Sequence, residues 1–579
     1  MIIDSVNDGI LLRWRDENRE IQSKKVDFQE FPPRFYIRAK EVEMKEVRGR
    51  DNFGSFTLTP KYRKTDFVNL DGEELKEVTW SPPNPAFAKT MRNWFGRNDI
   101  DTYEGDVPHH HRYAVENPDF FPEYEMRKWY WDMEWMQGGE YDEAITCIVR
   151  YDSYDKEYQT YVWYPDPPIS TDAEGKEVSS YENWESYVNC LWAGNKIRVF
   201  ANEKKMLQAF LGDMIHRDPD MLISWFGWKF DLPKLIERLI HNKLDAQLLS
   251  PCDEVTGVYW DVKKKIVTMD KKRVNSYSPT YQPIKGRLCV ALDAAFERQW
   301  MDSQRGTLPS MALDFVGETV LGRKKLVSGK FPDKNEFFAR AWQEDEETYL
   351  LYAKIDVELL VELDRTNHIT EAVLSLQRLL KAPFDACFHA TKMAAIYFMR
   401  NASWKAPTGK KEVMRSYDGA MVYDPLSEGT NGLHLGVAAF DFAGLYPSMM
   451  IARNISWETK SIVPTEFSVN IKTPKDFSPE TEFKMRYFKT DELGLLPRSL
   501  LGLKKLRNEY KANMKKAKDE DEYVMWNNNQ LAVKRLMASF YGIVGFQGYG
   551  WCDIELAEAI TASAREAIRK AASEARKLE

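Results

Sequence analysis

The sequence predicts a multidomain protein of mixed class, with α/β and α+β parts. Its 579 residues exceed what one hydrophobic core usually organises. Apolar residues make up 43% of the chain and aromatic residues 13%, which is ample material for several packed cores. Strand-like and helix-like patterns alternate through the middle of the chain, as they do in α/β domains. We therefore expect several domains in series.

Composition narrows the class of protein. No apolar run approaches the ~20 residues needed to span a bilayer, and the first residues lack the layout of a signal peptide. The six cysteines are scattered without a C-x-x-C pair, which argues against a zinc site or a disulfide framework. We expect a soluble protein with no membrane partner, in the cytoplasm of a prokaryotic or virus-infected cell.

The net charge of −8 does not by itself indicate nucleic-acid binding. DNA responds to the local field of a groove rather than to the charge summed over the surface. The informative question is where the positive charge is collected.

The chain opens with short strands and turns over residues 1–124, which predict a β-rich N-terminal domain. The triplet His109–His111 cannot place all three side chains on one metal without unusual backbone, so we expect a solvated loop there. Residues 125–360 alternate strands with helices. Residues from 361 onward read as helical, and an apolar strand at 436–442, a long basic helical pair at 498–540 and a final helix follow.

Four carboxylates and a tyrosine form the first constellation. Asp132 and Glu134 are two apart in an aromatic, strand-like run, so both point to one face, where two like charges call for a cation. Asp231 stands where a buried strand turns into an amphipathic helix. Tyr352 and Asp356 are spaced i, i+4 and share a helix face. Taken singly, these residues could be a strand face, a helix cap and a core aromatic.

In this order the three patterns resemble the exonuclease motifs of proofreading family B DNA polymerases. The resemblance implies phosphodiester hydrolysis with two Mg²⁺ or Mn²⁺ ions per active site. It implies Asp132, Glu134, Asp231 and Asp356 as metal ligands, with Tyr352 orienting the attacking water. Phe226 departs from the family pattern, which has Asn there to contact the DNA 3′ end, so grip and substrate choice are open.

The second constellation begins at Asp441, which follows an apolar strand and leads into Phe442-Ala443-Gly444-Leu445-Tyr446-Pro447-Ser448. This run resembles motif A of the family B polymerase site. The resemblance implies two Mg²⁺ ions held by the Asp441 carboxylate and the Phe442 carbonyl. It also implies nucleotide contacts from Leu445 and Tyr446, with Tyr446 as the steric gate against a 2′-hydroxyl. Gly444 replaces the family's usual Ser.

A basic helical pair follows. Its first helix carries cations spaced 3, 4, 4 and 3 residues apart, namely Lys504, Arg507, Lys511, Lys515 and Lys518. Alone this would be an ordinary solvated face, but its register resembles the fingers helix, which implies that Arg507 and Lys511 grip the triphosphate. The second helix resembles motif B, with Lys534 at the triphosphate and Tyr541 near the nascent base pair. Ala538 replaces the family's Asn.

Two shorter stretches support the resemblance. Tyr417-Asp418-Gly419-Ala420 resembles the element that guides the primer strand, so Tyr417, Gly419 and Ala420 are implied as DNA contacts, together with Gly542. The stretch 308–326 has the look of a family B exonuclease-domain segment.

The resemblance implies a domain order. We expect an N-terminal domain at 1–124, an RNase H-like 3′→5′ exonuclease domain at 125–360 and a helical return to the N-terminal domain at 361–410. A first palm part (411–490), helical fingers (491–540) and a second palm part (541–579) follow.

A second palm carboxylate centre, motif C, is not found in these residues, nor is a thumb. Asp553 and Glu555 have strand spacing, but their segment matches the family's helix after motif B. We therefore expect synthesis to need a second chain with motif C and the thumb, acting with primer–template DNA and dNTPs; a sliding clamp would attach through that chain. A natural split enzyme, a trans-splicing form and a truncated form all fit. The alternatives are a stand-alone 3′→5′ exonuclease and a non-catalytic DNA-binding scaffold.

Overall fold

A computed structural model of the chain describes residues 1–579 except 52–53, 173, 193, 280, 303–305, 410–415, 422–431, 438–440, 472–483 and 578–579. The chain divides into two compact units. The first comprises Met1–Val26, Phe121–Leu374 and Pro383–Phe388, and the second comprises Asp27–Phe120, Ser375–Ala382 and His389–Glu579. No helix among the described residues is long and apolar enough to cross a membrane.

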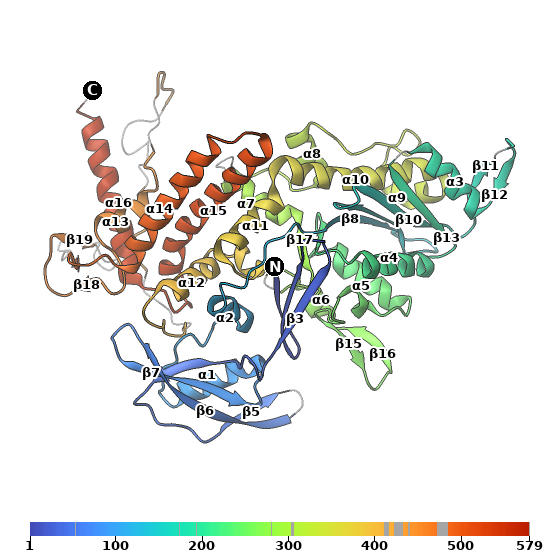
Figure 1. The fold of residues 1–579 in the computed structure, drawn as a ribbon. Coiled ribbons are helices and arrows are strands. Elements are labelled where there is room, and N and C mark those ends of the chain that lie inside the picture. Colours follow the sequence, from blue (N-terminus) through green and yellow to red (C-terminus); the bar gives the residue numbers. More distant parts are fainter. Residues whose placement is uncertain are drawn as a thin grey trace. The chain divides into compact units, whose positions relative to one another are not determined.

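The first unit is built around a six-stranded mixed sheet of order β13-β10-β9-β8-β14-β17 (Figure 1). Its strands are β8 (Lys128–Trp135), β9 (Ile145–Asp152), β10 (Glu157–Trp163), β13 (Asn195–Phe200), β14 (Met221–Ser224) and β17 (Leu288–Ala291). β9 runs antiparallel to β8 and β10, whereas β14 is parallel to both β8 and β17. Because β14 lies beside β8, the segment that follows β14 is brought close to the middle of the sheet.

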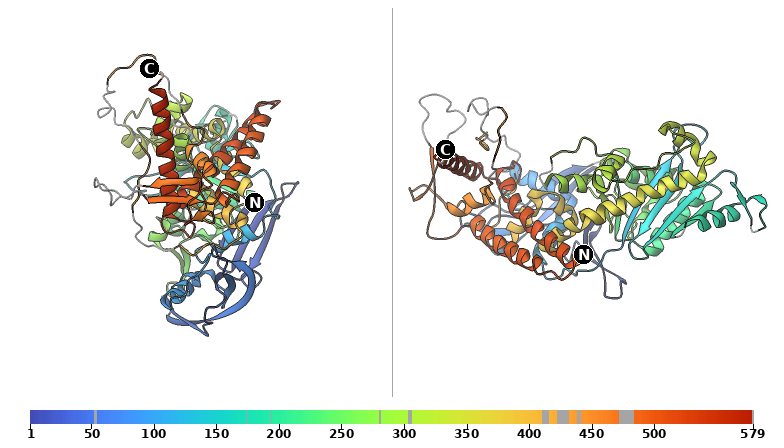
Figure 2. Two further views of the ribbon diagram at one scale, coloured as in Figure 1. Left: turned by 90° about the vertical axis from the view of Figure 1, so that its left-hand side faces the viewer. Right: turned by 90° about the horizontal axis from the view of Figure 1, so that it is seen from above.

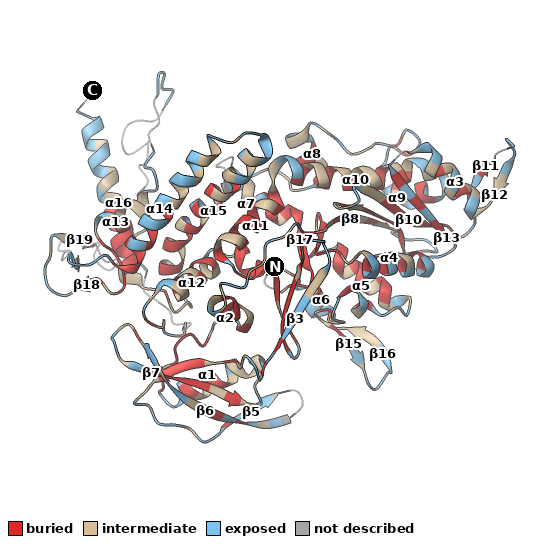
Figure 3. Cartoon of the chain, viewed as in Figure 1, coloured by how far each residue is buried: buried red, intermediate tan, exposed pale blue. Residues whose placement is uncertain are grey.

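Helices cover this sheet and bury its strands, most of which are red in Figure 3. The helices of the unit are α3 (Tyr181–Leu191), α4 (Glu203–Arg217), α5 (Asp231–His241), α6 (Lys271–Val274), α7 (Leu292–Asp302), α8 (Leu313–Leu321), α9 (Lys334–Glu344), α10 (Glu346–Asn367) and the start of α11 (Ile369–Leu380). Two short 3₁₀ turns, η2 (Ala246–Leu249) and η3 (Phe384–Phe388), complete them. The long helix α10 runs beside the sheet and packs on β8 and β9 (Figure 2).

Smaller sheets flank the main one. A three-stranded sheet contains β1 (Ile2–Val6), β2 (Gly9–Arg15) and β3 (Ile21–Asp27). Two hairpins pair β11 (Ile169–Thr171) with β12 (Glu177–Ser179), and β15 (Val258–Asp261) with β16 (Ile266–Met269).

The second unit begins with a four-stranded antiparallel sheet of order β4-β7-β6-β5. Its strands are β4 (Phe35–Arg38), β5 (Val47–Asp51), β6 (Gly54–Val68) and β7 (Glu74–Ser81), and η1 (Pro85–Phe87) and α1 (Ala88–Arg97) follow. Period-2 alternation turns Phe35, Val47, Leu58 and Val78 to one face, where they bury against α1. The predicted β-rich opening is therefore confirmed.

The rest of the second unit is mainly helical. It contains α2 (His109–Glu116), α12 (Ala390–Asn401), α13 (Leu445–Ala452), α14 (Leu495–Met514), α15 (Glu520–Gly545) and α16 (Ile554–Ala575). A small sheet of order β18-β20-β19 comprises β18 (Lys460–Ser461), β19 (Phe467–Ile471) and β20 (Lys484–Phe488). Together the two units confirm the predicted mixed fold class, whereas the bounds of the six predicted domains stay predictions.

The prediction of a solvated loop at His109–His111 is wrong. These residues form the first turn of α2, and His109 and His111 are buried. The rings of Phe28 and Phe31 lie 5.6 and 5.2 Å from the His109 ring, and burial lowers the pKa of His109 to about 3. Aromatic neighbours about 80 residues away in the sequence therefore make this histidine a neutral core residue.

A buried network of ion pairs joins β2 to the six-stranded sheet. The fully buried Asp220 precedes β14; it accepts from Arg15 Nε at 2.6 Å and from the Arg127 backbone N–H at 2.9 Å. Arg13 pairs with Asp218, which also pairs with Arg287 at 2.6 Å. The first residues of the chain are thus held to this unit by ion pairs that are largely buried.

We predict that Asp220→Ala lowers the free energy of unfolding by about 3–5 kcal/mol. The substitution removes the buried carboxylate that pairs with the side chains of Arg15 and Arg13. Urea unfolding measures the change. The exposed pair Lys196–Glu157 gives the control, since Lys196→Ala should cost less than about 1 kcal/mol. Equal losses for the two variants would contradict the prediction.

Candidate functional site

Asp132 and Glu134 lie in the middle of the main sheet, on β8. Their spacing of two places both side chains on one face of the strand, while Trp131 and Met133 point to the other face and are buried in the core. The predicted strand and the shared face are therefore present, and both carboxylates are half-buried.

Asp356 reaches the same place from α10. A carboxylate oxygen from each of Asp132, Glu134 and Asp356 lies within 4.8 Å of the others. Tyr352 stands one turn before Asp356 on the same helix face, and both residues are buried. Strand and helix thus bring together three acids that are up to 224 residues apart in the sequence.

Asp231 approaches from the neighbouring strand. It is the first residue of α5, which follows the turn after β14, and it is buried. The turn is tight: a Cβ on Gly227 would come within 2.5 Å of Ser224 Oγ, so a larger residue there would displace the Ser224 hydroxyl. The Asp231 Oδ2 atom is buried without a hydrogen-bond partner, and the charge of Asp231 raises the pKa of Asp132. Asp231 therefore acts electrostatically on the cluster, although it lies outside the set of three oxygens within 4.8 Å.

Lys325 contacts this cluster and was not predicted from the sequence. Its Nζ forms an ion pair with Asp356 and lies 3.3 Å from the Tyr352 hydroxyl. It follows α8 in the stretch 308–326, beside Arg323 and Lys324. A lysine in a short basic run carries no local signal that separates it from its neighbours, so only the fold identifies it.

Each carboxylate in the cluster makes ionisation of the others less favourable. Removal from water raises the pKa of Asp132 and Glu134 well above the usual value, and the neighbouring carboxylates raise each further. Burial raises the pKa of Asp231 to about 6, against a hydrogen bond from Ser224 that lowers it. For Asp356 burial again raises the pKa, and Lys325 opposes the shift.

The arrangement fits hard divalent cations. Carboxylate oxygens are the ligands that Mg²⁺ and Mn²⁺ prefer, and clustered acids with raised pKa values gain most from a nearby positive charge. Asp356 Oδ1 and Asp231 Oδ2 are both buried without a hydrogen-bond partner. Such atoms are costly to bury unless something else coordinates them.

A second group of predicted residues lines a cavity of about 390 Å³ in the second unit. Its wall includes Ala420, Leu445, Tyr446, Arg507, Lys534 and Tyr541, together with the two departures Gly444 and Ala538. These residues come from four separate segments, and α16 adds Ala564 and Ile568. Most of the remaining wall is apolar, and Arg507 and Lys534 are its only lysine or arginine residues among those described.

Aromatic contacts organise one side of this cavity. The rings of Tyr446 and Tyr541 are 4.5 Å apart, and the hydroxyls of Tyr417 and Tyr541 are 3.1 Å apart. Arg565 of α16 donates to the carbonyls of Asp418 and Gly419 at 2.6 and 2.7 Å. The short segment at 416–421 is therefore fixed against α15 and α16.

The sequence predicted that Asp441 lies at the end of an apolar strand. Asp441 and Phe442 are exposed and lie outside any described strand, and the predicted strand residues 438–440 lie outside the described residues, so the strand stays a prediction. No described strand pairs with residues 441–442. Gly444 has φ +73°, a left-handed conformation that suits glycine, and α13 begins immediately after it.

The basic helical pair is α14 and α15, which pack against each other. Arg507 and Lys511 lie on α14, and the proximity of Arg507 lowers the pKa of Lys511. α14 ends at Met514, so Lys518 belongs to the turn rather than to the predicted stripe. Gly542 lies on α15, one residue past Tyr541. Neither Lys511 nor Gly542 lines the cavity.

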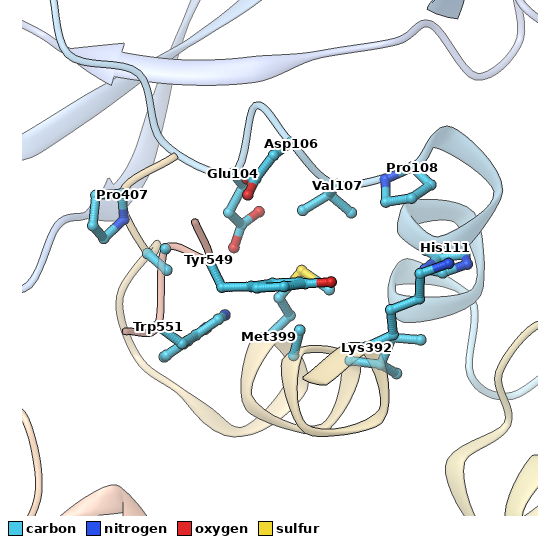
Figure 4. A pocket seen from close by; sticks show the side chains of 14 residues that line it. Glu104, Asp106, Val107, Pro108, His111, Lys392, Met399, Pro407, Tyr549 and Trp551 are labelled. Atoms are coloured by element: carbon cyan, nitrogen blue, oxygen red, sulfur yellow. The ribbon is translucent and has the colours of Figure 1, made fainter. Parts of the chain in front are cut away.

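A smaller cavity of about 50 Å³ lies elsewhere in the second unit, among Glu104, Asp106, Lys392, Tyr549 and Trp551 (Figure 4). Its volume suits one or two water molecules. The carboxylate of Glu104 is already held by Arg112 Nη1 at 2.9 Å, and Asp106 accepts from the Gly409 N–H at 3.2 Å. These two acids therefore already have hydrogen-bond partners within the protein.

Comparison with known proteins relates two segments of the chain to one family, and these segments include Asp231, Asp356 and the residues that line the larger cavity. A sequence model of DNA polymerase family B matches residues 354–578, and a model of the exonuclease domain of that family matches residues 144–253. The DNA polymerase of Pyrococcus glycovorans is 27% identical over 81% of this chain and 54% of its own length. That of Desulfurococcus sp. (strain Tok) is 26% identical over 94% of this chain and 64% of its own length. The chain thus spans about half to two thirds of the relatives that it matches.

The raised pKa of Asp231 yields a pH-dependent prediction. Its pKa in the folded state, about 6, lies above that of an unfolded aspartate, so the folded state binds the proton more tightly and loses stability as pH rises between about 4 and 6. Without divalent metal, Asp231→Asn should therefore raise the free energy of unfolding at pH 7 by on the order of 1–3 kcal/mol. The gain should fall towards zero below about pH 4.

Urea unfolding in EDTA at both pH values measures this difference. Asp245→Asn, which removes a largely solvent-facing acid that caps a 3₁₀ turn in the same unit, is the control and should give no gain at pH 7. A gain for Asp231→Asn that is as large at pH 4 as at pH 7 would contradict the assignment.

Proposed function

The chain belongs to DNA polymerase family B, and on that premise we propose that its first unit is a 3′→5′ exonuclease acting on DNA. The observation that carries the proposal is the cluster of Asp132, Glu134 and Asp356, whose oxygens lie within 4.8 Å of one another and have Asp231 nearby. The matched exonuclease-domain model covers residues 144–253, which include Asp231, and the matched polymerase model begins at residue 354 and includes Asp356.

Asp132, Glu134, Asp231 and Asp356 would hold two divalent ions, Mg²⁺ or Mn²⁺. When bound, such ions polarise the phosphate, supply hydroxide near neutral pH and stabilise the departing 3′ oxygen. Tyr352 presents its hydroxyl beside Asp356, where it can orient the attacking water. Lys325 keeps the acids partly neutralised and fixes the Tyr352 hydroxyl through the 3.3 Å contact. Phe226 offers a ring where family members have an amide, so we propose that apolar contact replaces a hydrogen bond to the DNA end.

For the second unit we propose a nucleotide site in the 390 Å³ cavity. Arg507 of α14 and Lys534 of α15 provide positive charge for a triphosphate, and Lys511 lies near both of them. Tyr446, whose ring lies 4.5 Å from that of Tyr541, would sit under the sugar, and Leu445 would line the same pocket. Tyr417, Gly419, Ala420 and Gly542 would contact the primer strand, and Asp441 with the Phe442 carbonyl would bind metal.

We further propose that synthesis needs a carboxylate supplied from outside these residues, by a second chain with motif C and the thumb. A two-ion site needs more than one carboxylate. Asp553 caps α16 and pairs with Lys460 at 2.7 Å, and Glu555 pairs with Arg486 at 2.6 Å. These two acids are therefore engaged structurally, and Asp441 would act with a residue of the partner chain.

The exonuclease is tested on a 5′-labelled primer–template with Mg²⁺. We predict that the chain shortens the primer and that Asp132→Ala/Glu134→Ala lowers the rate by at least about 100-fold, because the metal site is lost. Lys325→Ala should lower it by roughly 10-fold. The control Glu174→Ala/Glu177→Ala removes two exposed acids of the same unit and should be as active as the wild type. Shortening that survives in the Asp132/Glu134 variant would disprove the site.

The polymerase proposal is tested by adding dNTPs to the same primer–template. We predict no extension by the chain alone, since one exposed carboxylate cannot hold two ions. Extension by the purified chain would show that another of its own carboxylates completes the site. Absence of both extension and shortening, with DNA binding retained, would instead favour a non-catalytic scaffold. If the primer is only shortened, and adding a chain that carries motif C does not produce extension, the result would favour a stand-alone exonuclease.

A further inference from the structure

Two buried hydrogen-bonded contacts tie α10 to the main sheet, one on each side of the carboxylate cluster. β8 and α10 supply the three clustered acids, so the separation of these two elements decides how far apart the acids lie. The contacts involve residues that have no role in the proposed chemistry.

The first contact joins Tyr349 of α10 to β8 through Thr146 of β9. Thr146 Oγ1 donates to the Glu134 carbonyl oxygen at 3.1 Å and lies 2.7 Å from the Tyr349 hydroxyl. Because the single hydroxyl proton of Thr146 is used on Glu134, the proton between the two hydroxyls belongs to Tyr349. Tyr349 and Thr146 have no exposed surface. This contact holds the backbone of a residue whose side chain belongs to the cluster.

The second contact joins Tyr130 of β8 to Asp364 of α10. The Tyr130 hydroxyl donates to Asp364 Oδ2 at 2.5 Å. Asp364 also accepts from the backbone N–H and the hydroxyl of Thr370 at 2.7 and 2.6 Å, so its carboxylate is saturated and fixed. Tyr130 and Asp364 are both buried.

The order of the residues along each element brackets the cluster. Tyr130, Asp132 and Glu134 follow one another on a single face of β8. Along α10, Asp356 lies between Tyr349 and Asp364, seven residues from one and eight from the other. One contact therefore lies at the Glu134 end of the cluster, and the other beyond Asp132.

The contacts oppose a specific force. Acids that raise one another's pKa repel when charged, and this repulsion pushes α10 away from β8 whenever metal is absent. Apolar packing is non-directional and resists such a shift only weakly. A buried hydroxyl that moves away from its partner loses a hydrogen bond that no water can replace. Such a contact therefore fixes the distance between the two elements that it joins.

We propose that Tyr130, Thr146, Tyr349 and Asp364 are positioning residues that hold the β8 and α10 carboxylates at the separation two divalent ions require. The inference rests on the proposed exonuclease site. A site preorganised in this way binds metal without first having to draw the strand and helix together, so loosening either contact weakens metal binding more than it weakens the fold.

The test is Mn²⁺ binding to the full chain, followed by the electron paramagnetic resonance signal of free Mn²⁺ and independent of catalysis. Tyr349→Phe and Tyr130→Phe each remove one hydroxyl and keep the ring. We expect the apparent dissociation constant for Mn²⁺ to rise by about 3–10-fold in each. The exonuclease assay should show a similar rise in half-saturating metal with little change in the rate at saturation.

Tyr277→Phe is the matched control, since it removes an equally buried hydroxyl that donates to the Thr256 carbonyl at 2.6 Å in the same unit. It should lower thermal stability in EDTA as much as the other two variants but leave Mn²⁺ binding unchanged. At Thr146, Thr146→Ser keeps the hydroxyl and should restore wild-type affinity, whereas Thr146→Val should not.

The inference would be overturned if both tyrosine variants bind Mn²⁺ as tightly as the wild type does. It would also be overturned if Tyr277→Phe weakens Mn²⁺ binding as much as they do. The Asp132→Ala/Glu134→Ala variant separates this failure from that of the proposed function. If it binds Mn²⁺ as the wild type does, the acids are not the metal site, and the proposed function and this inference both fall. If it loses binding while both tyrosine variants keep it, only the positioning role falls.

Discussion

Mutual repulsion among acids at the junction of β8 and α10 is the constraint on which the first unit depends. The structure places three carboxylate oxygens within 4.8 Å of one another and adds Asp231 from the neighbouring strand. Such a cluster is unfavourable in isolation, because burial and neighbouring charge both oppose ionisation. The surrounding features can be understood as responses: Lys325 supplies an opposing charge, the glycine turn at 227 admits Asp231, and hydrogen bonds hold the helix on the sheet.

Much of this site could be predicted from local spacing. Residues two apart on a strand share a face, and so do residues four apart on a helix. The pairs Asp132 with Glu134 and Tyr352 with Asp356 could therefore be predicted from the sequence. Asp231 was accessible because a buried strand followed by an amphipathic helix predicts a turn between them. The meeting of the three segments, in contrast, depends on the order of strands in the sheet, and here the resemblance to a family was needed.

What the sequence could not supply were residues defined only by long-range contact. Lys325 lies in a basic run and is identified by reaching Asp356, 31 residues away. Tyr349, Thr146 and Asp364 look like ordinary core and helix residues. His109 was misjudged for the same reason, because the aromatic rings that bury it are distant in the sequence. Asp441 is exposed although a local strand pattern suggested burial, and the predicted strand itself, at 438–440, lies outside the described residues and stays a prediction.

The two sites differ in how complete they are, and this difference bears on what each unit can do. The exonuclease acids sit on a six-stranded sheet and a 22-residue helix that are part of one core, with buried hydrogen bonds on both sides. The cavity of the second unit has cations and two contacting tyrosines in place, but its candidate metal ligand, Asp441, is exposed and belongs to no described strand. A rigid support can hold like charges together against repulsion, whereas an exposed segment cannot. The packing of the described residues therefore favours the hydrolysis that we propose for the first unit, whereas the nucleotide addition that we propose for the second unit would need further support for Asp441.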